Sequence, residues 1–257
     1  MSTVIYADDF RIFHDTTGRE IVACLRSFNP RTNVVKVELK NKSIKTVKAS
    51  IFLEEDQAYI QDWHTTDALL SGSIQLTANK KTVRSDKYHE ERNGWYAVYP
   101  CMKFEDMNYE ILLENRSGQN FSNIKIEYCI YHQCTIDETF MTMEYIEKKN
   151  ANGYFPLETK KLPRRVVSNV TGGSWLIPEM NNRNKEELQT KEIRLRQGSE
   201  YKSDNYKLTR NTRKIDDELL GIRIRLYIPL KSGEKAMKEF FFPDTLEKTT
   251  RWVSPTD

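Results

Sequence analysis

Alternating apolar and polar residues near the N-terminus constrain the fold most strongly. In Val35–Lys40, apolar residues alternate with charged ones, which is the pattern of a strand with one buried face. Residues 21–26 and 44–47 show the same period of two, and turn-forming residues at 29–33 and 41–43 separate these segments. Three strands joined by short turns predict a small curled sheet or barrel.

The segment that follows these strands predicts a short helical turn. Glu54, Glu55 and Asp56 would lie in its first turn, where the helix dipole favours negative charge. Tyr59 would lie against the open end of the barrel, and Trp63 would plug it. We therefore expect one helical turn to close the small β unit.

The N-terminal segment also resembles a known family. It is similar to Sla homology domain one over residues 8–63, in the order and spacing of Arg11-x-Phe13-x-Asp15-x-x-Gly18, Ala23, the Val35/Val37/Leu39 strand and Glu54-Glu55-Asp56-x-x-Tyr59-Ile60. That family comprises small Src-homology-3-like barrels in Sla-type endocytic adaptors and in uncharacterised bacterial proteins. The resemblance implies such a barrel over residues 1–68, binding proteins rather than catalysing a reaction. Asp15 stands where that family has a turn residue, so we expect it to close a turn.

In the adaptors this domain is associated with extended Asn-Pro-Phe-x-Asp peptides. A binder of that kind needs a groove for the aromatic ring and a cation for the aspartate. The candidate cations are Arg11, Arg19, Arg26 and Lys36. The alternative interpretation is that each is an ordinary solvated surface charge.

A second β domain is expected over residues 72–257, after a linker at Asp67–Ser73. Six or seven half-buried antiparallel strands fit a β-sandwich, and their alternation is seen in residues 74–77, 109–114, 124–131, 193–196, 222–227 and 240–242. The segments Tyr109–Ser117 and Asn123–Ile130 look like parts of an immunoglobulin-like sandwich. The fold class predicted for the whole chain is therefore mainly β.

Residues 135–187 interrupt this alternation and predict a long connection within the sandwich. This connection carries a basic cluster of Lys160, Lys161, Arg164 and Arg165. The cluster is a candidate contact for an acidic partner, for phosphate groups or for an anionic surface. Alternatively, it is a solvated loop with no partner.

The sequence contains no motif that predicts catalysis or a bound cofactor. Cys129-x-x-His132-x-Cys134 superficially resembles a metal site, but on a strand Cys129 would face away from the other two. With no second cluster to complete four ligands, we predict no metal. The four cysteines are too sparse for a disulfide scaffold, and one bridge among Cys101, Cys129 and Cys134 remains an open alternative.

Composition and charge set further limits. The chain has 257 residues, with 40 Lys and Arg against 37 Asp and Glu, and this near balance argues against a general nucleic-acid binder. No apolar run is long enough to span a membrane. Residues 1–10 lack the basic and apolar regions of a secretory signal. This predicts a cytoplasmic protein, or one of the cell envelope or exterior if a leader has been removed.

Three functions remain open at this point. The first is a non-enzymatic adaptor or scaffold that binds a protein or peptide partner. The second is a carbohydrate- or cell-surface-binding sandwich that presents Trp95, Tyr96 and Tyr99 as a sugar platform. The third is an enzyme whose site is assembled at the domain junction, which a deep polar cleft there would favour.

Overall fold

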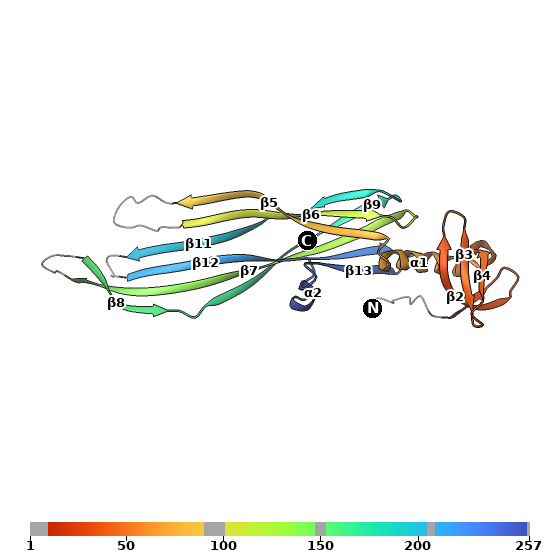
Figure 1. The fold of residues 1–257 in the computed structure, drawn as a ribbon, viewed down its shortest axis with the longest axis horizontal. Coiled ribbons are helices and arrows are strands. Elements are labelled where there is room, and N and C mark those ends of the chain that lie inside the picture. The colour runs from red at the N-terminus through yellow and green to blue at the C-terminus, as the bar shows by residue number, and fades with distance from the viewer. Residues whose placement is uncertain (1–9, 90–100, 147–152, 205–208, 256–257) are drawn as a thin grey trace.

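The chain forms a small four-stranded sheet, one long helix and a large antiparallel sheet (Figure 1). The computed structural model describes residues 10–89, 101–146, 153–204 and 209–255. Strands dominate these residues, so the predicted mainly β fold class is confirmed. The small sheet lies at one end of an elongated molecule, and the long strands reach the other end (Figure 1).

The small sheet is an antiparallel meander whose strands pair in chain order. Its elements are β1 (Arg11–His14), β2 (Glu20–Asn29), β3 (Val34–Leu39), β4 (Ile44–Lys48) and the 3-10 turn η1 (Ala49–Ile51). Val35 and Val37 are buried, as their alternation predicted, and Leu39 is partly buried. Phe52, Ile60 and Trp63 complete this core.

Helix α1 (Glu54–Leu70) is 17 residues long, so the prediction of a single helical turn is wrong. The helix continues because it packs on two cores. Ile60 and Trp63 lie in the core of the small sheet, whereas Leu69 lies in the core of the large sheet. The first four residues of the expected linker, Asp67–Leu70, are therefore the end of this helix.

The large sheet contains the remaining strands, several of them unusually long. They are β5 (Ile74–His89), β6 (Cys101–Asn115), β7 (Phe121–Ile146), β8 (Gly153–Lys161), β9 (Arg165–Met180), β10 (Lys185–Gln189), β11 (Ile193–Asp204), β12 (Thr209–Pro229) and β13 (Lys235–Phe242). A short helix, α2 (Leu246–Thr249), follows them.

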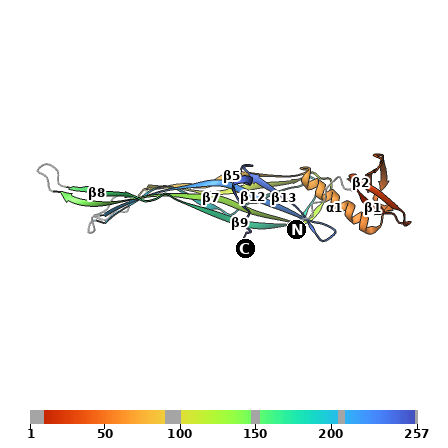
Figure 2. The same ribbon diagram turned by 90° about the horizontal axis from the view of Figure 1, so that it is seen from below.

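The large sheet divides into two layers near α1. Away from α1 the strand order is β5-β6-β11-β12-β7-β8. Toward α1, β10 replaces β11 beside β6, β13 replaces β11 beside β12, and β9 replaces β8 beside β7. The result is one layer of β5-β6-β10 and a second layer of β13-β12-β7-β9, and Figure 2 shows the strands separating toward α1.

The main core fills the space between these layers. Its fully buried members include Ile111 and Leu113 of β6, Ile124, Ile126 and Ile130 of β7, and Ile222, Ile224 and Leu226 of β12. Away from α1, the buried apolar residues among those described form a small cluster of Met102, Cys134, Ile136 and Ile215. The burial of apolar area, which is the main stabilising term in folding, is therefore concentrated next to α1. The barrel-like and immunoglobulin-like identities of the two parts stay predictions.

The predicted long connection over residues 135–187 is wrong. Most of these residues belong to β7, β8, β9 and the start of β10. They lack the expected alternation because the strands here are solvated on both faces. The first six residues of β9, for example, are all exposed. A strand of this kind has no buried face to impose a period of two on its sequence.

Candidate functional site at the junction of the two sheets

Arg11, the first of the predicted ligand cations, fastens β1 to α1. Its Nη2 atom lies 2.9 Å from Oδ1 of the buried Asp56, and its guanidinium lies 3.9 Å from the centre of the Tyr59 ring. The other oxygen of Asp56 accepts the backbone N–H of His14 at 2.7 Å. Arg11 therefore has a structural role in this part of the chain.

Arg19 is paired within the turn between β1 and β2. Its Nε atom lies 2.7 Å from Oδ2 of Asp15, and Asp15 also accepts the hydroxyl and the backbone N–H of Thr17. The hydrogen bonds from Thr17 and Arg19 hold the pKa of Asp15 below its usual value. Asp15 is thus the turn-closing residue that its sequence position predicted.

Arg26 and Lys36 lie on the small sheet. Arg26 Nε is 2.7 Å from Glu38 Oε2 on the neighbouring strand, and Lys36 is exposed on β3. Of the four predicted cations, three are thus engaged in ion pairs within the chain. None of these four residues contributes to the lining of the two clefts at the junction of the sheets.

An open polar cleft of about 720 Å³ lies where the small sheet meets the large one. Four segments surround it: the β2–β3 turn, helix α1, the turn after β6 and the turn after β9. Its lining residues are Phe28, Asn29, Pro30, Arg31, His64, Glu114, Arg116, Ser117, Gly118, Asn182 and Arg183. Both parts of the chain contribute side chains, so the cleft exists only in the assembled molecule.

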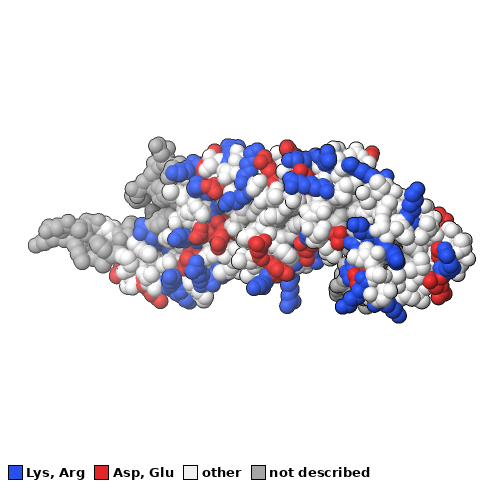
Figure 3. Space-filling model, turned by 45° about the vertical axis from the view of Figure 1, so that its right-hand side comes forward, with Lys and Arg blue, Asp and Glu red and all other residues white. Residues whose placement is uncertain are grey.

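The cleft carries an excess of positive charge, with three arginines and one glutamate in its lining. Glu114 is neutralised by Arg116 at 2.6 Å, which lowers the pKa of this carboxyl. For Arg31 and Arg183, no ion pair is found among the described residues. Lys, Arg, Asp and Glu are interspersed over the face shown in Figure 3.

His64 places a polar atom without a partner in the wall of the cleft. Its Nε2 atom is buried and makes no hydrogen bond within the described part of the chain. Its ring packs edge-on against Phe28, with ring centres 5.6 Å apart. Burial lowers the pKa of His64, which favours the neutral imidazole. Buried polar atoms in native proteins are normally hydrogen-bonded, so this nitrogen is an exception among the described residues.

A second cleft of about 430 Å³ shares Phe28 and Pro30 with the first. Phe121, Pro229 and Leu230 give it apolar surface. The rest of its lining is mainly polar, so the apolar side chains that both clefts share, Phe28 and Pro30, lie beside the arginines of the first cleft. This combination of surfaces suits an extended segment that carries an aromatic ring and a carboxylate.

Hydrogen bonds fix the walls of the cleft. The fully buried Asn115 accepts the hydroxyl of Ser117 at 2.7 Å, and its backbone oxygen accepts the N–H of Arg183 at 2.7 Å. The Oδ1 atom of Asn182 accepts the N–H of Gly118 at 2.9 Å. The turns that hold Arg116 and Arg183 are therefore tied to each other.

The small sheet is also held in place against the large one. Asp62 of α1 accepts the backbone N–H groups of Lys231 and Ser232 at 2.6 and 3.0 Å. Lys238 of β13 donates to the backbone oxygen of Leu69 at 2.9 Å. Because α1 belongs to both cores, these contacts set the distance across the cleft.

The predicted basic cluster lies elsewhere, between β8 and β9. Arg165 is 2.9 Å from Glu138, and Arg164 is 3.9 Å from Asp137, so β7 neutralises part of the cluster. Lys160 and Lys161 are exposed at the end of β8. The aromatic residues predicted as a sugar platform, Trp95, Tyr96 and Tyr99, lie outside the described residues.

The cysteine and histidine residues of the 129–134 segment are separated. Cys129 donates to the backbone oxygen of Val253 at 2.8 Å, and its pKa is raised by burial. Cys134 lies beside Arg196 and Asp217. Among the described residues, no three His, Cys, Asp or Glu side chains are grouped closely enough to hold a metal ion. The four cysteines are not cross-linked.

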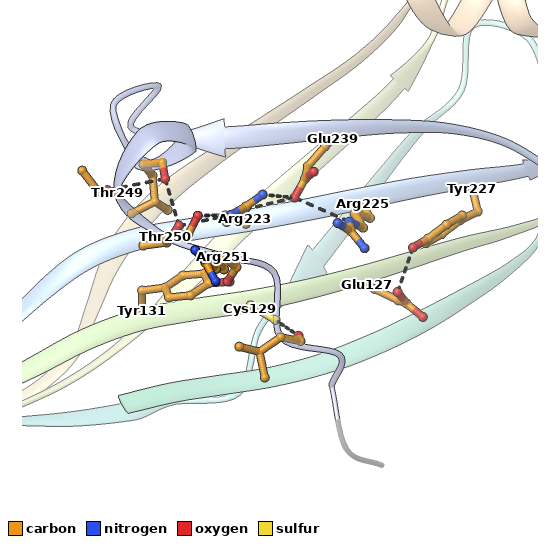
Figure 4. A network of polar contacts seen from close by, with 12 residues as sticks. Glu127, Cys129, Tyr131, Arg223, Arg225, Tyr227, Glu239, Thr249, Thr250 and Arg251 are labelled. Carbon is orange, nitrogen blue, oxygen red and sulfur yellow. Dashed lines mark hydrogen bonds and ion pairs between the residues drawn. The ribbon is translucent and has the colours of Figure 1, made fainter. Parts of the chain in front are cut away.

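Figure 4 shows the polar network around Cys129, which fastens the C-terminal segment to the outer face of β7 and β12. Arg223 donates to Glu239 at 2.7 Å and to the backbone oxygen of Thr250 at 2.5 Å. The hydroxyl of Tyr131 donates to the backbone oxygen of Arg251 at 2.7 Å. Because the partners are mostly backbone oxygens of the chain itself, this network has a structural role.

No protein-family model matches this chain, and no curated protein matches it significantly. The described helices include none with the length and apolar character needed to cross a bilayer. The function must therefore be inferred from the junction itself.

Proposed function

We propose that the protein is a non-enzymatic adaptor or scaffold that binds an extended peptide segment of a partner protein at the junction of its two parts. The observation that carries this proposal is the position of Arg31 and Arg183 beside the apolar surface of Phe28 and Pro30. These cations lie across the cleft from each other, one on the small sheet and one on the large sheet. Each is a donor for a carboxylate of the partner.

The chemistry of the cleft suits such a ligand. A guanidinium presents two parallel N–H groups that match a carboxylate, and Phe28 and Pro30 offer apolar surface to an aromatic ring. Since hydrogen bonds already fix the walls of the cleft, the chain itself loses little conformational entropy when a peptide binds.

This proposal assigns the carboxylate of the ligand to different cations from those that the family resemblance suggested. Arg11 and Arg19 already hold Asp56 and Asp15, so binding through them would break a structural ion pair. Binding through Arg31 and Arg183 breaks no ion pair that the described residues contain.

Titration of a fluorescent Asn-Pro-Phe-x-Asp peptide with the full chain tests this function. We expect saturable binding that is lost when the phenylalanine of the peptide is replaced by alanine. Arg183→Gln should weaken binding about tenfold, because it removes a charged hydrogen bond. The matched control is Lys36→Gln, an exposed cation of the small sheet, which should leave the affinity unchanged. Equal affinities of R183Q and the wild type would contradict the proposed site.

Carbohydrate binding is the second candidate, and a different hollow favours it. Trp175 stacks on Tyr128 with ring centres 4.5 Å apart, and both line a hollow of about 380 Å³ with Gln189 and Thr190. Aromatic surface next to polar side chains is what a sugar ring requires. An oligosaccharide panel that quenches tryptophan fluorescence in the wild type, but not in Trp175→Phe, would favour this function.

A further inference from the structure

Strand β9 forms an open edge of the large sheet. It pairs with β7 on one side, and no other described strand pairs with it. Its outer row of backbone N–H and C=O groups therefore lacks a strand partner in the described part of the chain. Such an edge is a template for pairing with another chain.

The composition of β9 differs from that of every other edge strand described. Each of those strands contains Lys or Arg, which discourages edge-to-edge association. Such residues are Arg11 in β1, Lys45 in β4, Lys80 in β5, Lys160 in β8, Lys185 in β10 and Lys238 in β13. The charged residues of β9, Arg165 and Glu179, lie at its two ends, and the long stretch between them from Val166 to Pro178 has none.

This uncharged stretch also presents apolar side chains to solvent. Ile177 is buried in the main core, so the residues of even number lie on the opposite, outer face. On that face Val166, Val170 and Leu176 are 57%, 39% and 64% exposed. β9 thus combines an open edge, a missing charge barrier and an exposed apolar strip.

We propose that two copies of this chain associate by antiparallel pairing of their β9 strands, centred on Gly172. The residues that end the uncharged stretch support this register. When Gly172 lies opposite Gly172 of the second copy, Arg165 lies opposite Glu179, so opposite charges meet at both ends of the paired strands. Opposite-charge cross-strand pairs stabilise a sheet, whereas like charges destabilise it.

The same register joins the exposed apolar residues of the two copies. Val170 lies opposite Ser174 and diagonal to Leu176 of the second copy, within reach of a side-chain contact. Pro178, which has no N–H to donate, lies near the ends of the paired region. A slip by one residue would separate the charge pairs and turn the apolar strip to the other face.

Sedimentation velocity of the full chain over a wide concentration range tests this proposal. We expect a monomer–dimer equilibrium in the wild type. Arg165→Glu and Glu179→Arg should each weaken dimerisation about tenfold or more, because each places like charges together at two symmetric contacts. The double variant R165E/E179R restores both pairs with their charges exchanged and should recover most of the affinity. Glu187→Arg, on the exposed edge strand β10, is the matched control and should not change it.

Arg165 also pairs with Glu138 within the chain, so a loss in R165E alone could come from a local change. The recovery in the double variant distinguishes the two causes, since a damaged strand is not repaired by E179R. A wild-type chain that stays monomeric at the highest attainable concentration would overturn the proposal. So would single and double variants that dimerise equally.

Discussion

At the scale of single residues, three buried aspartates hold the chain in place, one within a turn and two between segments that lie far apart in sequence. Asp15 closes the β1–β2 turn, Asp56 joins α1 to β1, and Asp62 joins α1 to the β12–β13 turn. Each accepts backbone N–H groups, which offsets the cost of burying a charge. The sequence predicted the turn role of Asp15, because all its partners are local. It did not reveal the pair of Arg11 and Asp56, which are 45 positions apart.

The pH dependence of stability should reveal the role of Asp15. Its pKa in the folded chain lies below its unfolded value of about 3.9. Its contribution is therefore complete above about pH 5 and is lost as the pH falls through the folded pKa. We expect Asp15→Asn to be less stable than the wild type near neutral pH, with a difference that shrinks on acidification. Denaturant unfolding at several pH values measures this, and a constant difference would contradict the assigned role.

At the scale of elements, helix α1 is the connection on which the junction depends. The sequence predicted its start, where three acidic residues occupy the first turn, but not its length. The end of the helix is determined by Leu69, whose burial requires a core built from strands much later in the chain. Local propensity cannot show such a contact, because tertiary packing decides where a helix continues.

Two adjacent residues of α1 provide a matched test of this packing. Leu69 is fully buried, whereas Leu70 is 51% exposed. Leu69→Ala should lower the free energy of unfolding by about 2–5 kcal/mol, since it leaves a cavity in the main core. Leu70→Ala should change it little. Chemical denaturation compares the two, and equal losses would show that α1 does not enter the large core as described.

In the β8–β9 region the sequence pattern failed to predict strands that the structure contains. Strands that continue beyond the core carry little alternation, so the sequence predicted a loop where the chain forms strands. The charges of Lys160, Lys161, Arg164 and Arg165 are solvated, and those that pair do so at the surface.

Neutralising all four residues to glutamine should therefore leave the unfolding midpoint nearly unchanged, because exposed ion pairs contribute little to stability. Thermal unfolding at low and high salt provides the measurement. A large loss at low salt that disappears at high salt would mean that the cluster is a structural network.

At the scale of the whole molecule, the candidate site arises from topology. The alternating segments predicted most of the core-forming strands, from β2 and β3 to the halves of β7 and β12 that lie next to α1. The cleft, however, combines turns at residues 28–31, 114–118 and 182–183 with His64 in the middle of α1. Nothing in the local sequence indicates that these segments meet, because their proximity depends on the division of the large sheet and on the length of α1.

Peptide binding at the junction can be tested by titrating the isotope-labelled full chain with the Asn-Pro-Phe-x-Asp peptide. The measurement is the change in its amide chemical shifts. We expect saturable shifts at Phe28, Asn29, Arg31, His64, Gly118 and Arg183, on both sides of the junction, and none with the alanine control peptide. Shifts confined to the neighbourhood of Arg11, Arg19 and Arg26 would instead place the ligand on the small sheet alone and contradict the junction site. The absence of any shift would contradict peptide binding of this kind.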